Sequence, residues 1–315
     1  MLIYSTSSEF CQGDDFIRDG VRRLLDPAPA DSEIWINRFG VRLAGTESNV
    51  WKVLRNMPPV AEYLPMARAF VCAGTPAWLN NTRDWWELCI EHNVPIWLIG
   101  VGSRQNNADM LPLGKHLIEV ATTRDHGAGK MLTAAGVPHE RFLDPGFHAP
   151  YFHPRPKIFP VVLTYRHRRA HHECDQEGRE AAYVGLWRKF RDAIAAVVVH
   201  EPDEIAHARR LFGVEPFFSH DWRRYAEVYC ATEHYIGGRL HGAIPVLAGG
   251  GTAHLLYCNA KTEGVTAHDW LPVTCHKHEA WDDIALGRGH DPAEVRARIQ
   301  ADFTAHRGYI QEAVG

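Results

Sequence analysis

The sequence predicts an α/β protein of two domains, each a parallel sheet covered by helices. Segments with strand-like and helix-like patterns alternate along all 315 residues, which is typical of doubly wound parallel sheets. The most hydrophobic segment, residues 95–102, shows no polar alternation, as expected of a strand that is covered on both faces. Prolines gather at residues 150–156, where the periodicity stops, and this break predicts the domain boundary.

The first half alternates short apolar segments with amphipathic ones. Apolar residues at helical spacing, such as Phe16, Ile17 and Val21, predict a helix that begins near residue 16. The loop before it carries Gly13, Asp14 and Asp15. The expected strands are residues 2–5, 33–37, 69–74, 95–102, 119–123 and 141–143, and the expected helices are residues 16–25, 82–92 and 126–135.

The second half repeats the alternation. We place the boundary between residues 153 and 154, so that the domains are 1–153 and 154–315. Pro202 suits the first position of a helix, and Asp221 suits the cap of the next one. The expected strands are residues 159–165, 195–200, 215–219, one ending near 236, and 254–258; the expected helices are 177–192, 202–212, 221–228, one starting near 240, and a charged terminal helix from 291 to about 313.

Composition excludes several classes of partner. The chain is 45% hydrophobic and 23% charged with a net charge of −4, so a general nucleic-acid or membrane-surface binder is not expected. No apolar run approaches the ~20 residues that a membrane span needs, and the first residues lack the basic and hydrophobic regions of a signal peptide. Seven cysteines, an odd number without a Cys-x-x-Cys pair, argue against a disulfide framework and a thiolate zinc site. These features predict a cytoplasmic protein.

Histidine is abundant, with 20 residues, and two clusters contain residue types that bind transition metals. They are residues 171–175, with His171 and His172, and residues 276–279, with His276 and His278. Neither puts two imidazoles at i, i+4 with a carboxylate, and both lie in polar stretches. No metal site is therefore predicted.

A glycine-rich turn at residues 234–250 is the strongest candidate for a ligand site. Gly237, Gly238 and Gly242 would let the backbone turn sharply and let a ligand approach closely. Arg239 and His241 would lie at the start of the following helix, where unpaired N–H groups and the helix dipole favour an anion. The plainer interpretation is an ordinary strand-to-helix turn with a surface arginine and a half-buried histidine.

Several pieces of the chain follow the order found in one enzyme family. The run Gly-Arg-Leu-His-Gly-Ala-Ile at 238–244, followed by Lys261, resembles the C-terminal signature of the polysaccharide pyruvyl transferases. The weaker pieces are Gly13-Asp14-Asp15, Gly100-Val-Gly102, Arg124-Asp125 and Asp144-Pro145. The resemblance implies the GT-B-like arrangement, with two Rossmann-like domains facing a cleft. It also implies transfer of a pyruvyl group from phosphoenolpyruvate to two hydroxyls of a saccharide as a ketal, in exopolysaccharide biosynthesis.

The resemblance assigns roles to named residues. Arg166, Arg239 and the amides of Leu240 to Gly242 would bind the phosphate and carboxylate of phosphoenolpyruvate, with His241 as the general acid that protonates its methylene. Lys261 would add a positive charge or be a surface lysine. Asp14 or Asp15 would act on an acceptor hydroxyl, or cap a helix. His148, at the expected hinge, could point into the cleft.

The partners follow from this scheme, and two alternatives stay open. Phosphoenolpyruvate would be a co-substrate, no cofactor or metal would be needed, and the first domain would hold a saccharide, nucleotide-sugar or lipid-linked sugar acceptor. A lipid-linked acceptor would bring peripheral association with a membrane. The first alternative is a GT-B glycosyltransferase that uses a nucleotide sugar. The second is a non-catalytic protein that binds carbohydrate or phosphate.

Overall fold

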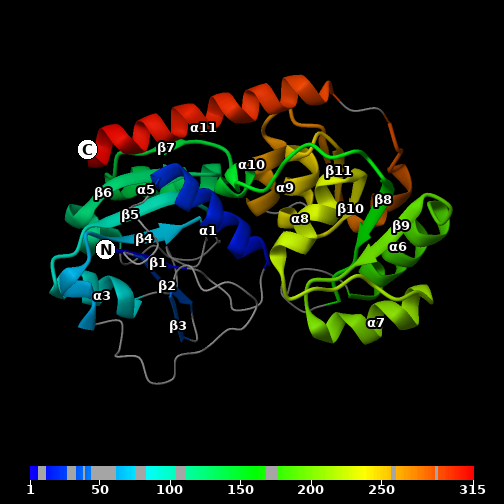
Figure 1. Cartoon of the computed structure of the whole chain (residues 1–315), viewed down its shortest axis with the longest axis horizontal. Coiled ribbons are helices and arrows are strands. Elements are labelled where there is room, and N and C mark those ends of the chain that lie inside the picture. Colours follow the sequence, from blue (N-terminus) through cyan, green and yellow to red (C-terminus); the bar gives the residue numbers. More distant parts are fainter. Residues whose placement is uncertain are drawn as a thin grey trace. The chain divides into compact units, whose positions relative to one another are not determined.

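The chain folds into two α/β units, seen in a computed structural model (Figure 1). The structure describes residues 1–5, 12–26, 33–37, 40–43, 62–74, 83–103, 111–167, 176–256, 260–287 and 290–315. Unit 1 comprises residues 1–9, 14–150 and 300–315, and unit 2 comprises residues 10–13 and 151–299. The sequence-based boundary lies between 153 and 154 and assigns the whole terminal helix to the second domain.

Unit 1 contains a seven-stranded sheet in the order β3-β2-β1-β4-β5-β6-β7. Neighbouring strands are parallel except for β2 and β3, which form an antiparallel pair. The strands are β1 Leu2–Ser5, β2 Glu33–Asn37, β3 Gly40–Leu43, β4 Ala69–Ala73, β5 Ile96–Val101, β6 Ile118–Thr123 and β7 Glu140–Arg141. The helices are α1 Gln12–Leu25, α3 Arg83–Glu91, α4 Leu111–Gly114 and α5 His126–Ala135, with 3₁₀ turns η3 Leu64–Met66, η4 Lys115–Leu117 and η5 Pro145–His148.

Unit 2 contains a five-stranded, all-parallel sheet in the order β12-β11-β10-β8-β9. The strands are β8 Phe159–Thr164, β9 Ile194–Val198, β10 Thr232–Gly237, β11 Thr252–Leu256 and β12 Val273–His276. The helices are α6 Gln176–Lys189, α7 Pro202–Phe212, α8 Trp222–Cys230, α9 Leu240–Ala248 and α10 Ala260–Thr266, with the 3₁₀ segment η6 His278–Asp283. The last helix, α11 Pro292–Val314, begins in unit 2 and ends in unit 1.

The central strands of unit 1 are covered on both faces. Ile96 and Leu98 of β5 belong to one apolar core with α3 and α5, whereas Trp97 and Ile99 belong to another with α1 and α11. Because successive side chains of a strand point to opposite faces, a strand packed on both sides must be apolar throughout. This explains the unbroken hydrophobic run at residues 95–102, and the predicted α/β fold with two parallel-sheet units is confirmed.

Several individual features depart from the prediction. The expected strand at 215–219 is reduced to one bridge, between Val198 and Phe217. Strands β3 and β12 were not expected. Helix α1 begins at Gln12, so Asp14 and Asp15 lie in its first turn and not in the loop before it. Cys275 is disulfide-bonded, contrary to the expectation of reduced cysteines.

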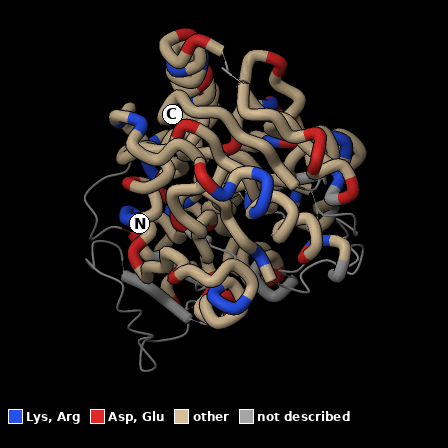
Figure 2. Tube along the Cα trace, turned by 90° about the vertical axis from the view of Figure 1, so that its right-hand side faces the viewer, with Lys and Arg blue, Asp and Glu red and all other residues tan. Residues whose placement is uncertain are grey.

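Charge and hydropathy along the trace add two observations. Acidic and basic residues are interspersed over the described part of the chain (Figure 2). Among the described helices, none combines the length and hydrophobicity required to cross a bilayer.

Candidate functional site

In the unit 2 sheet, the order of the strands reverses between β8 and β10. From β8 the chain moves outward to β9, but from β10 it moves in the opposite direction, to β11 and β12. In open α/β sheets, ligands bind beyond the carboxyl ends of the strands at such a switch point. The loops that leave β8 and β10 carry Arg166, Arg239 and His241, and we call this region the switch-point site.

Close packing fixes the turn between β10 and α9. A Cβ atom at Gly237 would lie 2.7 Å from the carbonyl oxygen of Thr164, and one at Gly242 would lie 2.8 Å from the ring of Tyr235. The Tyr235 hydroxyl donates to the Arg239 carbonyl at 2.7 Å and accepts from the Arg239 N–H at 3.2 Å. The Gly238 N–H donates to the Tyr183 hydroxyl at 3.2 Å. The glycines are therefore required by close approach of neighbouring groups.

One buried carboxylate ties three loops of the switch-point site together. Glu204, which is 1% exposed, accepts hydrogen bonds from the backbone N–H groups of His167 at 3.1 Å, His200 at 3.1 Å and Glu201 at 3.2 Å. It also accepts from the Arg239 guanidinium at 2.5 Å. These donors come from the loops that follow β8, β9 and β10, so Glu204 fixes the loops relative to one another. All four donors are N–H groups, so the protein itself satisfies the carboxylate.

Arg239 is less available to a ligand than the sequence suggested. Its side chain is 9% exposed and pairs with Glu201 at 3.2 Å in addition to Glu204. The Gly242 amide, one of three expected to bind an anion, donates to the Arg239 carbonyl at 3.0 Å. Arg239 is thus a buried N-cap residue of α9 held by carboxylates.

Three of the predicted basic residues act electrostatically on His200. Burial lowers the pKa of His200 well below its usual value, and the positive charges of Arg239, His241 and Arg166 lower it further. His200 Nε2 lies 2.6 Å from the Tyr229 hydroxyl. The structure therefore brings together Arg166, Arg239 and His241, and it adds His200, Glu201 and Glu204. The one sequence signal for this acidic pair was the capping-box spacing of Glu201 and Glu204 around Pro202.

Within the switch-point site, His241 packs on Gly13, where an added Cβ would be 2.3 Å from its Nδ1 atom. The remaining predicted site residues are placed as follows. Asp14 and Asp15 are 8% and 7% exposed, and Asp15 pairs with the buried Arg18 at 2.7 Å. His148 is buried in unit 1 beside Asp302. Lys261 lies in α10, and its side chain is outside the described residues.

The motif pieces of the first half are structural. Arg124 forms a buried ion pair with Asp144. The Asp125 carboxylate caps α5 by accepting from the Ala128 N–H at 2.8 Å, and it also accepts from the Ser103 N–H at 2.8 Å. These are the ion-pair and turn-forming roles that their residue types most often have.

Comparison with known proteins gives a fold and no sequence family. No family model matches the chain, and no curated protein matches it in sequence. UDP-GlcNAc 2-epimerase from Neisseria meningitidis, solved with UDP-GlcNAc, superimposes with a TM-score of 0.53 at 9% identity, covering 99% of this chain and 94% of that one. MnaA of S. aureus, solved with UDP, gives a TM-score of 0.53 at 12% identity, with coverages of 100% and 90%. HepE of Anabaena, solved with UDP and glucose, gives 0.55 at 9% identity, with coverages of 99% and 98%.

These findings confirm the GT-B-like α/β fold and overturn the family assignment. The similar structures are UDP-GlcNAc 2-epimerases and a protein holding UDP and glucose, and none of these is a pyruvyl transferase. The assignment to the polysaccharide pyruvyl transferases was therefore wrong, and so was pyruvyl transfer from phosphoenolpyruvate. The Arg-Leu-His-Gly run that suggested it is explained locally, because Arg239 is a carboxylate-bound cap and the glycines meet steric demands.

Proposed function

We propose that the protein is an enzyme that acts on a nucleoside-diphosphate sugar, most simply by transferring the sugar to a hydroxyl acceptor. The observation that carries the proposal is the switch-point site, where the start of α9, Arg166 and His241 lie near His200 at the carboxyl end of a parallel sheet. The fold shared with proteins solved with UDP or UDP-GlcNAc supports the choice of nucleotide over other anions.

The diphosphate suits the electrostatics of this site. A helix N-terminus and an arginine stabilise phosphate oxygens through N–H donors and positive charge. In glycosyl transfer, the bond between the sugar C1 atom and the phosphate oxygen breaks, and a bond from C1 to the acceptor oxygen forms. Negative charge grows on the departing diphosphate, so Arg166, His241 and the start of α9 would stabilise the transition state more than the bound substrate.

Arg239 and Glu204 have a different role in this scheme. Because Arg239 is held by two carboxylates, it positions the turn, and the ligand contacts fall to Arg166 and His241. Glu201, whose side chain is 33% exposed, has an acceptor suited to a ribose hydroxyl.

Calorimetry with UDP, GDP and their sugars tests the proposal. We expect wild-type protein to bind one of these nucleotides, and Arg166→Gln to weaken its binding about tenfold or more because a charged phosphate contact is lost. Arg209→Gln is the matched control, since Arg209 is exposed and pairs with Glu215 at 2.7 Å. Failure to bind any nucleotide or nucleotide sugar would overturn the proposal.

NMR of the bound nucleotide sugar then identifies the reaction. Release of the nucleotide with loss of the sugar C1 signal supports transfer or hydrolysis. Inversion at another sugar carbon, with the nucleotide still attached, would replace transfer by epimerisation. Tight binding without turnover against a panel of sugar acceptors would leave a non-catalytic binding protein.

A further inference from the structure

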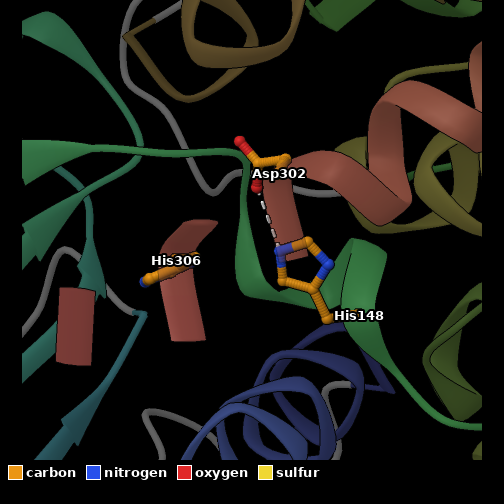
Figure 3. Close-up of side chains that lie close together, drawn as sticks. All are labelled: His148, Asp302 and His306. Atoms are coloured by element: carbon orange, nitrogen blue, oxygen red, sulfur yellow. Dashed lines mark ion pairs between the residues drawn. The ribbon is translucent and has the colours of Figure 1, made fainter. Parts of the chain in front are cut away.

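A cluster in unit 1 has the composition of a transition-metal site. His148, Asp302 and His306 each offer one ligand atom, and these atoms lie within 4.8 Å of one another (Figure 3). His148 ends the 3₁₀ turn η5, whereas Asp302 and His306 are four residues apart on α11 and share one face of that helix. Figure 3 shows the Asp302 carboxylate facing a ring nitrogen of His148, with His306 beside them.

The imidazoles of this cluster lack the hydrogen bonds that buried polar groups normally have. His148 is 1% exposed and His306 is fully buried. Neither nitrogen of His148, nor Nδ1 of His306, has a hydrogen-bond partner among the described residues. Buried polar atoms without partners are rare and costly, so each calls for an explanation such as a bound ion.

The distance between His148 and Asp302 is that expected for two ligands of one metal ion. Nε2 of His148 lies 3.2 Å from Oδ2 of Asp302, yet this nitrogen makes no hydrogen bond, because the oxygen lies outside the direction that such a bond requires. Two ligands of a tetrahedral zinc ion, each about 2.0–2.1 Å from the metal, are separated by about 3.3 Å. The observed separation therefore matches co-ligands.

Neighbouring groups hold the other atoms of the cluster in place. Nε2 of His306 lies 2.9 Å from the Thr122 hydroxyl, and the ring stacks on Phe142 at 4.3 Å. Both Asp302 oxygens accept from the Leu143 N–H, at 3.2 and 3.3 Å. Such contacts, here made by His306 and Asp302, orient metal ligands in proteins.

The charges around the cluster are compatible with a cation. Asp302 supplies a carboxylate. Arg23 lies beside the cluster, and its printed contacts are with the His148 carbonyl, to which it donates at 3.3 Å, and with the Phe303 ring, over which it lies at 4.5 Å.

We propose that His148, Asp302 and His306 bind a divalent transition-metal ion, with zinc the best match, and that solvent completes the coordination. Two nitrogens and one oxygen form the donor set that zinc accepts with an open fourth position. Nδ1 of His306 is the ligand atom, because Nε2 is taken by Thr122. The ion would clip η5 to the α11 segment within unit 1, and this inference does not depend on the proposed function.

Zinc titration of metal-stripped, full-length protein tests the site. We expect one tight equivalent by calorimetry, a rise in Tm, and the visible absorption of four- or five-coordinate cobalt when Co²⁺ replaces zinc. His148→Gln and Asp302→Asn should each weaken zinc binding about tenfold or more, since even supporting contacts are worth that much. Asp302→Asn keeps an oxygen for the Leu143 N–H, and far-UV circular dichroism checks that both variants fold.

The control variant addresses the other histidines. His167, Glu180 and His207 form a second group in unit 2, but the Arg210 guanidinium lies 2.8 Å from Nδ1 of His207 and would repel a metal ion. His207→Gln should therefore leave the tight equivalent unchanged. Absence of zinc binding in the wild type, or binding that survives both His148→Gln and Asp302→Asn, would overturn the proposal.

Discussion

Glu204 in unit 2 and the His148–Asp302–His306 cluster in unit 1 are both buried polar groups, but their surroundings differ. Glu204 accepts from three backbone N–H groups and from Arg239, so its carboxylate is satisfied by the protein alone. In the cluster, three imidazole nitrogens have no hydrogen-bond partner among the described residues. A satisfied group stabilises the local structure, whereas an unsatisfied one calls for an explanation, of which a bound ion is one.

This difference distinguishes Glu204, which positions loops, from the His148–Asp302–His306 cluster, which can bind a ligand. Glu204 fixes the loops on which Arg166 and His241 are presented, and it has no need of a ligand itself. In the unit 1 cluster, three imidazole nitrogens have no donor or acceptor among the described residues, and the cluster therefore carries the metal proposal. Substitutions at Glu204, Gly13 and His254 test this distinction, and they follow in order of decreasing expected effect.

Replacing Glu204 should have the largest effect on stability. Glu204→Gln leaves the buried Arg239 without its closest negative partner, so the free energy of unfolding should fall by about 3 kcal/mol. Glu215→Gln, which breaks the exposed pair with Arg209, should change it by about 0.5 kcal/mol or less. Urea denaturation of both variants gives the comparison. Equal effects would mean that Glu204 is no more important than a surface carboxylate.

The substitution Gly13→Ala tests how closely His241 packs against Gly13. The new Cβ would lie 2.3 Å from Nδ1 and 2.6 Å from Cβ of His241, so Gly13→Ala should cost about 1–3 kcal/mol and weaken nucleotide binding. Gly308→Ala is the control: no described atom lies within 4 Å of where its methyl group would be, and alanine should stabilise the α11 helix by about 0.5–1 kcal/mol. Unchanged stability in Gly13→Ala would contradict the close contact.

His254 has one ring nitrogen with a hydrogen-bond partner and one without. Its substitution should have the smallest effect on stability at neutral pH. Its Nδ1 lies 2.8 Å from the Thr274 hydroxyl, but its buried Nε2 has no hydrogen-bond partner among the described residues. Burial first, and then the charges of His276 and His234, lower its pKa to about 4.

The sign of the pH effect follows from this lowered pKa. The unfolded chain takes up a proton near pH 6.5 and the folded chain only near pH 4, so the contribution to stability is complete above pH 6.5 and is lost as the pH falls towards 4. Thermal unfolding at pH 7.5 and pH 5 should show a smaller acid-induced drop in Tm for His254→Gln than for the wild type. An identical drop would assign the acid sensitivity to other groups.

The fold could be predicted because its signals are local. Helix α5 was predicted at both ends, since Asp125 caps its start and Gly136, with a φ of 70°, ends it. Helix α7 was predicted equally well from Pro202 to Phe212. The expected strand at 215–219 was wrong because only Phe217 reaches a neighbour, and strand pairing depends on the partner as much as on the segment.

The sites depended on contacts that no local pattern contains. Arg166, Arg239 and His241 were named because each lies next to a strand end, where ligands bind. The role of Glu204 could not be seen, since it requires three loops to converge on one carboxylate. The spacing of Asp302 and His306 was visible in the sequence, but it gained meaning only when the fold placed His148 against the same face of α11.

The path of α11 has a consequence for how the chain is made. Phe303 and Ile310 complete the apolar core that Tyr4, Ile17 and Val21 begin, so unit 1 takes its first and its final layers from opposite ends of the sequence. During synthesis, residues 1–150 therefore emerge long before that core can close, while every residue of unit 2 has left the ribosome first. Unit 1 must therefore wait for Phe303 and Ile310 with part of its apolar surface exposed, and such surface is prone to aggregation until it is covered.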